Sequence, residues 1–264
     1  MRWYISDSFV IARRSLEHVR QIPEKLFDVT IQPLMFVLLF AYVFGGVIAI
    51  PGGGSYKEYL IGGILVQTIA FGIMGPAVSM ATDMKEGIVD RFRSLPMARS
   101  AFLTGHLIGE LLAAMLAVTV LAVSGLVVGW RIHADLPHAL AGFGILMLFT
   151  FAMLWVGELI GVSVRSPDAV MGIGFIFVFP LTFLSNVFVP AGGLPDGLQQ
   201  VAEWNPISVL VAAVRTLFGN PTALPDNAAW PLAHPVVSSL IACAALLAVA
   251  VPLTLWRFRV RTTG

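Results

Sequence analysis

Six long apolar segments, separated by short polar connections, constrain this chain more than any other feature. They cover residues 31–50, 59–81, 101–129, 138–164, 169–189 and 236–256. As a helix, each segment is long enough to cross a hydrocarbon layer about 30 Å thick. Hydrophobic residues make up 58% of the chain and charged residues 12%, which is about half the charged share of a soluble domain. The segments therefore predict an all-α integral membrane protein with six transmembrane helices.

The first 28 residues have the pattern of an amphipathic helix and not that of a signal peptide. Their apolar residues recur at helical spacing: Ile5, Phe9, Ala12, Leu16 and Val19. A signal peptide would need a continuous apolar core and a small-residue cleavage site, and the segment has neither. We expect residues 1–28 to form an interfacial helix in the headgroup plane. The alternative is a soluble helix packed on a core.

Lysine and arginine are distributed unequally between the two sides that six crossings would create. Of the sixteen lysines and arginines, all but Lys57, Arg131 and Arg215 fall on the side that carries both termini. The richer side of a membrane protein is usually the cytoplasmic one. We therefore predict a multi-pass protein of the cell membrane, plasma or bacterial inner membrane, with both termini and the connection 83–99 in the cytoplasm.

The most charged connection, residues 83–99, has the features of a helix. Its apolar residues would share one face: Met84, Ile88, Phe92 and Leu95. Asp83 could cap the start, with Glu86 as the returning half of a capping box, and Pro96 would end the helix. Glu86 and Asp90 repel each other mildly unless a cationic partner approaches. We expect a cytoplasmic helix that docks on a partner; the alternative is a solvated loop.

The segment 190–235 differs from an ordinary loop because it contains a second, shorter apolar stretch. Residues 207–217 are apolar but too few to cross a membrane. Short apolar helices beside a span are stable in a membrane only where protein shields them. We expect re-entrant or interfacial helices on the extracellular side, with a small extracellular cap as the alternative.

Three polar residues lie within the predicted spans and are candidates for an intramembrane polar site: Gln67, Glu110 and Glu158. Buried charge in a membrane is costly and often functional. Glu110 and Glu158, however, lie toward the predicted cytoplasmic ends of their spans, where they could pair with His106 and Arg165. Both a structural role and a role in the transport pathway therefore remain open.

Proline and glycine positions predict local features of the helices. Pro76, within the second apolar segment, predicts a kink. Two glycine pairs, Gly125 with Gly129 and Gly157 with Gly161, have the spacing that lets helices approach closely. Such pairs indicate either close packing within the chain or contacts in a dimer.

The sequence contains no motif for catalysis, nucleotide binding or metal binding. The phosphate-binding pattern G-x-x-x-x-G-K-[ST] and the zinc pattern H-E-x-x-H are both absent. His133 and His138 lie in a loop without a nearby pair of acidic ligands, so we expect solvated or interfacial histidines. We predict a transporter component that is not itself an enzyme, with no metal and no cofactor in the chain. A self-contained secondary transporter would need ion sites near the midplane and usually internal repeats.

Three stretches together resemble the membrane subunit of ABC-2 type transporters, and most nearly the daunorubicin-resistance-type permeases. They are residues 83–112, with the charged helix followed by R-S-L-P; residues 179–206; and residues 207–221, with Arg215 and Gly219. The resemblance covers the whole chain in order. It implies a transmembrane domain at 29–264 and a permease subunit of an ATP-driven exporter of lipophilic or amphipathic substrates such as drugs, lipids or glycolipids.

The resemblance also implies partners and residue roles. Two copies of a cytoplasmic ABC ATPase would hold ATP and Mg, and a second copy of the permease would complete a homodimer in membrane lipid, with no nucleic acid involved. A coupling helix would contact the ATPase through Asp83, Met84, Lys85, Glu86, Gly87, Ile88, Asp90, Arg91, Phe92 and Arg93. Arg165 and Asp168 would form a second, minor contact. Glu158 is not expected at its position in this family.

Overall fold

The structure is a computed structural model that describes residues 31, 34–44, 48, 50–87, 99–225 and 227–263. Its longer helices are α3 (Tyr56–Gly72), α4 (Met74–Lys85), α6 (Arg99–Val128), α7 (Leu136–Ser163), α8 (Pro167–Phe183) and α12 (Pro235–Thr263). Between α8 and α12 lie the shorter helices α9 (Asp196–Trp204), α10 (Pro206–Phe218) and α11 (Trp230–Ala233). Every regular element in the described ranges is a helix, so the all-α prediction is confirmed there.

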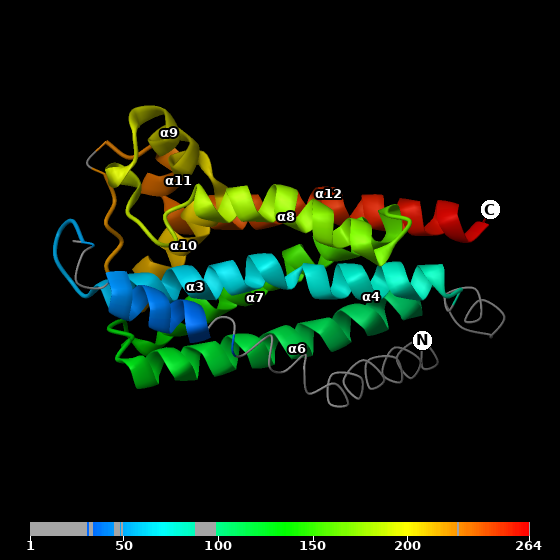
Figure 1. The fold of residues 1–264 in the computed structure, drawn as a ribbon, viewed down its shortest axis with the longest axis horizontal. Helices are drawn as coiled ribbons and strands as arrows, with labels where there is room; N and C mark the ends of the chain where they lie inside the picture. Colours follow the sequence, from blue (N-terminus) through cyan, green and yellow to red (C-terminus); the bar gives the residue numbers. More distant parts are fainter. Residues whose placement is uncertain are drawn as a thin grey trace.

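The long helices run side by side, and the short ones gather at one end of the bundle. Figure 1 shows α9, α10 and α11 where α3 and α12 begin and where α8 ends. The opposite end holds the end of α4, the start of α6, the turn between α7 and α8, and the C-terminus. Connections that the charge pattern assigns to the same side of a membrane therefore lie at the same end of the molecule.

Within the described residues, four helical segments have the length and composition expected of a membrane span. They are the α3–α4 pair at Tyr56–Lys85, then Leu103–Val128, Leu136–Ser163 and Pro235–Arg261. A fifth is possible if α9 and α10, which meet at an angle of 66°, together make one crossing. The apolar helices Leu34–Val43 and α8 are shorter. The six-span layout thus stays a prediction, and residues 1–28 lie outside the described ranges.

The interruption between α3 and α4 follows from Pro76. The two helices meet at Ile73, one turn before the proline. Proline has no N–H to donate, and its ring clashes with the carbonyl four residues earlier, which here belongs to Gly72. The predicted irregularity near Pro76 is therefore confirmed, and it interrupts a segment that still passes as one span.

Helices α4 and α7 pack closely because two glycines of α7 face the backbone of α4. A Cβ atom at Gly157 would lie 2.8 Å from the carbonyl oxygen of Ile73, and one at Gly161 would lie 2.7 Å from that of Ala77. This glycine pair therefore serves packing within the chain. The other predicted pair does not act as a unit: Gly125 packs on Ile61 and Trp130, whereas Gly129 follows the end of α6 with a φ of +112°.

Helix α8 ends at Phe183, six residues earlier than the apolar run predicts. Pro180 lies inside its last turn, and the side-chain amide of Asn205 donates to the carbonyl oxygens of Leu181 and Leu184 at 2.6 and 3.0 Å. A helix end that is buried needs such partners for its free carbonyls. The apolar residues after Phe183 therefore form an irregular segment held by neighbouring helices.

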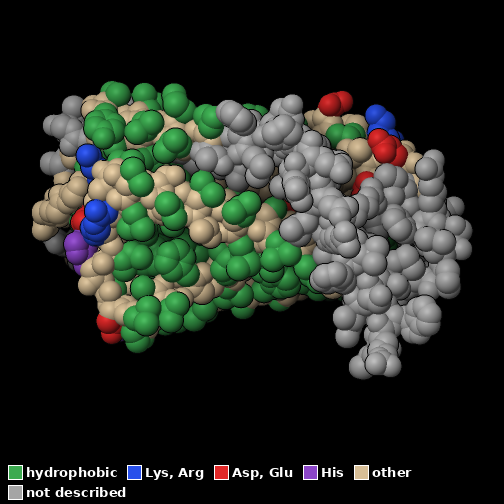
Figure 2. Space-filling model, turned by 90° about the horizontal axis from the view of Figure 1, so that it is seen from below, with side chains coloured by type: hydrophobic (Ala, Val, Ile, Leu, Met, Phe, Trp, Pro, Cys, Tyr) green, Lys and Arg blue, Asp and Glu red, His purple; other side chains and the backbone are tan. Residues whose placement is uncertain are grey.

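The outer surface of the bundle is apolar, as a lipid-facing surface requires. In Figure 2, hydrophobic side chains are spread over the visible face of the described part, charged side chains lie at both of its ends, and histidine is visible at one end. Val127, Ile176 and Phe177 are each more than two-thirds exposed. An apolar surface of this extent in a soluble protein would promote aggregation, so the distribution fits a multi-pass membrane protein.

Candidate functional site

The predicted coupling segment begins as a continuation of α4 and not as a separate helix. Asp83, Met84 and Lys85 form the last turn of α4, and Glu86 follows as its C-terminal cap, with its N–H bonded to the carbonyl of Thr82 at 2.9 Å. The prediction that Asp83 caps a new helix is therefore wrong. Extending an existing helix costs less than nucleating another, and no residue before Gly87 breaks this one.

Gly87 turns the chain away from the axis of α4. Its φ is +66°, a value that glycine adopts easily and other residues adopt only with strain. Lys85 and Glu86 are exposed just before this turn. The other predicted coupling residues lie outside the described ranges: Ile88, Asp90, Arg91, Phe92 and Arg93.

The predicted second contact lies at the same end of the bundle as Gly87 (Figure 1). Arg165 is in the short turn between α7 and α8, and Asp168 is in the first turn of α8. The side chain of Ser166 accepts a hydrogen bond from the N–H of Ala169 and so caps α8. Arg261 of α12 donates to the carbonyl of Val164 at 2.8 Å, which ties the last helix to this turn.

Two of the three intramembrane candidates come together in a polar group between α4, α6 and α7. Glu158 of α7 is fully buried and is hydrogen-bonded to Nδ1 of His106 in α6. Nε2 of His106 lies 3.1 Å from the hydroxyl of Ser79 in α4 and 3.9 Å from Oε1 of Glu110. The expected pairing with His106 is thus present. Gln67 is also buried but lies 12 residues before Ser79, about 18 Å along the helix axis.

At the opposite end, Arg215 is buried completely inside the group of short helices. Its guanidinium donates to the carbonyl oxygens of Tyr59, Asn186 and Val187 at 2.8, 3.1 and 3.0 Å. Its charged end also lies 3.3 Å from the centre of the Tyr59 ring. The charge pattern treats Arg215 as an ordinary extracellular charge. Arg215 stands alone within the short apolar run 207–217, and this position is the sequence signal for a buried arginine with partners inside the protein.

The irregular segment after α8 is held against α3 by two tyrosines. The hydroxyl of Tyr59 donates to the carbonyl of Asn186 at 2.8 Å, and that of Tyr56 donates to the carbonyl of Phe188 at 3.1 Å. The segment lies close to the backbone of α3, as a Cβ atom added at Gly63 would be 2.4 Å from the carbonyl oxygen of Val187. Arg215 and the two tyrosines therefore join α10, α3 and the end of α8.

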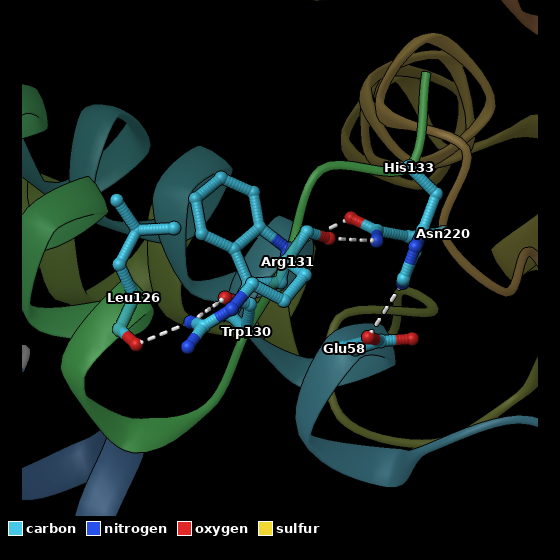
Figure 3. Close-up of polar contacts among 6 residues, drawn as sticks. All are labelled: Glu58, Leu126, Trp130, Arg131, His133 and Asn220. Carbon is cyan, nitrogen blue, oxygen red and sulfur yellow. Dashed lines mark hydrogen bonds and ion pairs between the residues drawn. The ribbon is translucent and has the colours of Figure 1, made fainter.

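The loop after α6 is fixed to the same end by a second polar network, drawn in Figure 3. The indole N–H of Trp130 donates to the side chain of Asn220 at 2.8 Å, and that side chain donates to the carbonyl of Arg131 at 2.7 Å. His133 contacts Glu58 of α3 at 2.8 Å. Trp130 is buried, so the loop that the sequence describes as polar is anchored by an aromatic residue.

The histidines of this loop are exposed, and each also has an acidic partner. His133 is paired with Glu58, and His138 is paired with Asp135, the N-cap of α7. The hydrogen bond from His138 holds the pKa of Asp135 below its ordinary value. Within the described ranges, no three histidine, cysteine or acidic residues are grouped so that they could hold a metal ion.

Comparison with known proteins identifies the family of this chain. Residues 7–218 match the ABC-2 type transporter family. The chain belongs to that family. It is 30% identical over 248 residues to the daunorubicin resistance ABC transporter permease protein DrrB1 of Streptomyces coeruleorubidus, covering 93% of this chain and 83% of that protein. It is 27% identical over 237 residues to the doxorubicin resistance ABC transporter permease protein DrrB of Mycobacterium tuberculosis, covering 85% and 80%. A probable multidrug ABC transporter permease of Escherichia coli, YbhR, is 24% identical over 189 residues.

Family membership makes this ABC-2 chain a multi-pass membrane protein of the permease class. A row of aromatic rings extends from the outer face of α8 through the buried Phe188 to the helix Leu34–Val43. The rings of Phe179 and Phe183 stack at 4.3 Å, that of Phe183 lies 5.4 Å from Phe188, and that of Phe188 stacks on Phe40 at 4.3 Å. Phe179 and Phe183 remain more than two-fifths exposed. This row gives α8 an unusually aromatic outer face.

Proposed function

We propose that this chain is the permease subunit of an ATP-driven exporter that moves lipophilic or amphipathic molecules out of the cytoplasm or the inner leaflet. The match of residues 7–218 to the ABC-2 family carries the proposal. These residues lack the phosphate-binding motif of an ATPase, and in this proposal a second polypeptide supplies the energy. Relatives named for daunorubicin and doxorubicin resistance favour drug-like cargo, with lipids and glycolipids as further candidates.

In this proposal, a cytoplasmic ATPase subunit, which binds ATP and Mg, contacts the segment that starts at the end of α4. Lys85 and Glu86 are exposed there, and Gly87, directly after them, has a left-handed backbone conformation. The turn at Arg165 and Asp168 supplies a second contact at the same end of the bundle. The lysine and arginine distribution supports a cytoplasmic location for this end and for both termini.

The aromatic row on α8 is the surface on which we propose that a second copy of the chain and the cargo meet. Stacked rings provide apolar area with little side-chain freedom to lose, which suits flat lipophilic molecules. Phe175, Phe179 and Phe183 follow one another at intervals of four and face outward. A homodimer would place two such rows opposite each other, and movement of α8 would change the space between them.

A second candidate function is a self-contained secondary transporter, which the buried pair of His106 and Glu158 favours. Ionisable groups inside a membrane often carry protons in transporters. The pair lies near one end of its helices, however, whereas ion sites of such transporters usually lie near the midplane. The two candidates differ in their energy source, so one experiment separates them.

That experiment reconstitutes the full-length chain in liposomes with and without the ATPase subunit that co-purifies with it. Daunorubicin, which is fluorescent, serves as the probe, and lipid and glycolipid probes follow. We expect movement of a probe only when both polypeptides and ATP with Mg are present. Transport by the permease alone on a proton gradient, or the absence of any ATPase that binds it, would contradict the proposal.

Changing Gly87 to proline should abolish coupling without preventing membrane insertion. Proline fixes φ near −65°, whereas Gly87 has a φ of +66°, so the segment beyond it must change direction. We expect ATP-dependent transport to fall at least about tenfold, which corresponds to about 1.4 kcal/mol of lost transition-state stabilisation. Glu86→Ala, which removes an exposed carboxylate at the same place, is expected to act in the same direction.

Gly53→Pro is the matched control for Gly87→Pro. Gly53 also has a positive φ, +85°, its N–H also closes a turn, and no atom lies within 4 Å of an added Cβ at either glycine. The two substitutions impose similar local strain at opposite ends of the bundle. Equal losses of transport would show that strain and not ATPase contact is responsible, and full transport in Gly87→Pro would remove the coupling role.

A further inference from the structure

The polar group formed by His106, Glu158 and Ser79 joins three helices at one depth in the bundle. His106 is on α6, Glu158 is on α7 and Ser79 is on α4, and His106 contacts the other two through its two ring nitrogens. His106 is 4% exposed and Glu158 is 0% exposed. Residues 52 positions apart in the sequence thus share a contact from which water is almost entirely excluded.

This group lies close to the end of the bundle where the chain leaves α4. Ser79 precedes the last residue of α4 by six positions, His106 follows the first residue of α6 by seven, and Glu158 precedes the last residue of α7 by five. At 1.5 Å per residue, all three lie about 8–11 Å from the ends of their helices. Asp83 is one turn beyond Ser79 on the same helix.

The contact resists separation, because an ionisable group left alone in a dry interior is costly. Removal of one partner from a buried pair destabilises a protein more than the pair itself stabilises it. Glu158 depends on His106 strongly, since its second carboxylate oxygen, Oε2, is buried with no hydrogen-bond partner in the described part of the chain. Glu110 of α6, with an oxygen 3.9 Å from His106, is a second acidic group near this site.

We propose that His106 and Glu158 are positioning residues that make α6 and α7 move together with the end of α4 during transport. A displacement of the segment at Gly87 would reach α7 through Ser79, His106 and Glu158, in addition to the apolar packing of α4 on α7. The aromatic face of α8 follows α7 across the short turn at Arg165. This inference rests on the proposed function, because it needs an ATPase that moves the end of α4.

The test measures ATP hydrolysis and probe transport together, in liposomes that hold the full-length chain and its ATPase subunit. Glu158→Gln and His106→Gln keep side chains of similar length but remove the charge pair. We expect ATP hydrolysis within about twofold of the unchanged complex and transport per ATP lower by about tenfold, inside the range usual for coupling between sites. The double exchange of His106→Glu with Glu158→His restores a histidine–glutamate pair between α6 and α7. It should recover part of the lost transport per ATP.

Thr150→Val is the matched control on α7. Thr150 is buried like Glu158, but its hydroxyl donates to the carbonyl of Leu146 in the same helix and joins no second helix. We expect this variant to leave transport per ATP unchanged.

Three results would overturn the inference. The first is unchanged transport per ATP in both glutamine variants. The second is a fall in transport that only follows the amount of assembled complex. The third is failure of both variants to assemble, which would make the pair a folding element. Failure of the proposed function looks different, since the unchanged complex would then show no ATP-dependent transport at all.

Discussion

Replacing Arg215 with leucine is expected to remove most of the stably folded protein. The guanidinium bonds at once to α3 and to the irregular segment after α8, through the carbonyls of Tyr59, Asn186 and Val187. Hydrogen bonds from a charged donor contribute about 1.5–3 kcal/mol each, although removal of a buried charge returns part of that energy. We expect a net loss of about 3 kcal/mol, a large part of the 5–15 kcal/mol that typically separates folded from unfolded protein.

The measurement is the apparent melting temperature of the detergent-solubilised chain, which should fall by about 10 °C for a loss of this size. Arg131→Leu is the matched control, since Arg131 lies at the same end and also donates to two backbone carbonyls, but it is exposed. Arg215→Lys should be intermediate, because an ammonium group cannot reach carbonyls on two segments as the planar fork does. Equal stability of Arg215→Leu and Arg131→Leu would show that the buried network is dispensable.

The sequence predicts the long helices well because crossing a membrane requires about 20 consecutive apolar residues. The segments 59–81, 101–129, 138–164 and 236–256 all correspond to long apolar helices, with the interruption near Pro76 also foreseen. Hydropathy does not reveal where an apolar run stops being helical. Residues 184–189 belong to the predicted span 169–189 but are irregular, and Asn205 and Arg215, which are distant in the sequence, satisfy carbonyls in this stretch.

Polar partners were predicted only as possibilities, since their positions depend on how helices pack. Glu158 could have paired with His106 or Arg165, and only the packing of α7 against α6 and α4 selects His106. Asp83 shows the reverse problem. Its sequence context is typical of an N-cap, but the helix already present in α4 continues through it. Local patterns therefore identify candidate residues, while tertiary contacts decide their roles.

Replacing Gly161 with valine is the second change with a large expected effect. A Cβ atom there would lie 2.7 Å from both the carbonyl oxygen of Ala77 and the Cβ of Met80, and backbone atoms of a packed helix cannot move aside individually. Helices α4 and α7 must then separate. Overpacking of a close interior usually costs up to about 3 kcal/mol, and contact with backbone places this site at the upper end. We expect a fall of about 10 °C in apparent melting temperature.

Gly144→Val separates packing from the general effect of valine in a helix. Gly144 is on the same helix, and an added Cβ there would meet no atom within 4 Å. We expect this control to be as stable as the unchanged protein or nearly so. Both substitutions alter helix propensity equally, so a larger loss in Gly161→Val would report the packing contact. If Gly161→Val were equally stable, α7 would not rest on α4 at this glycine, and the glycine pair would instead be available for contact with a second copy of the chain. In that case the path from the end of α4 to Glu158 would lose part of its physical basis, since Ser79, which contacts His106, is on α4 and Glu158 is on α7.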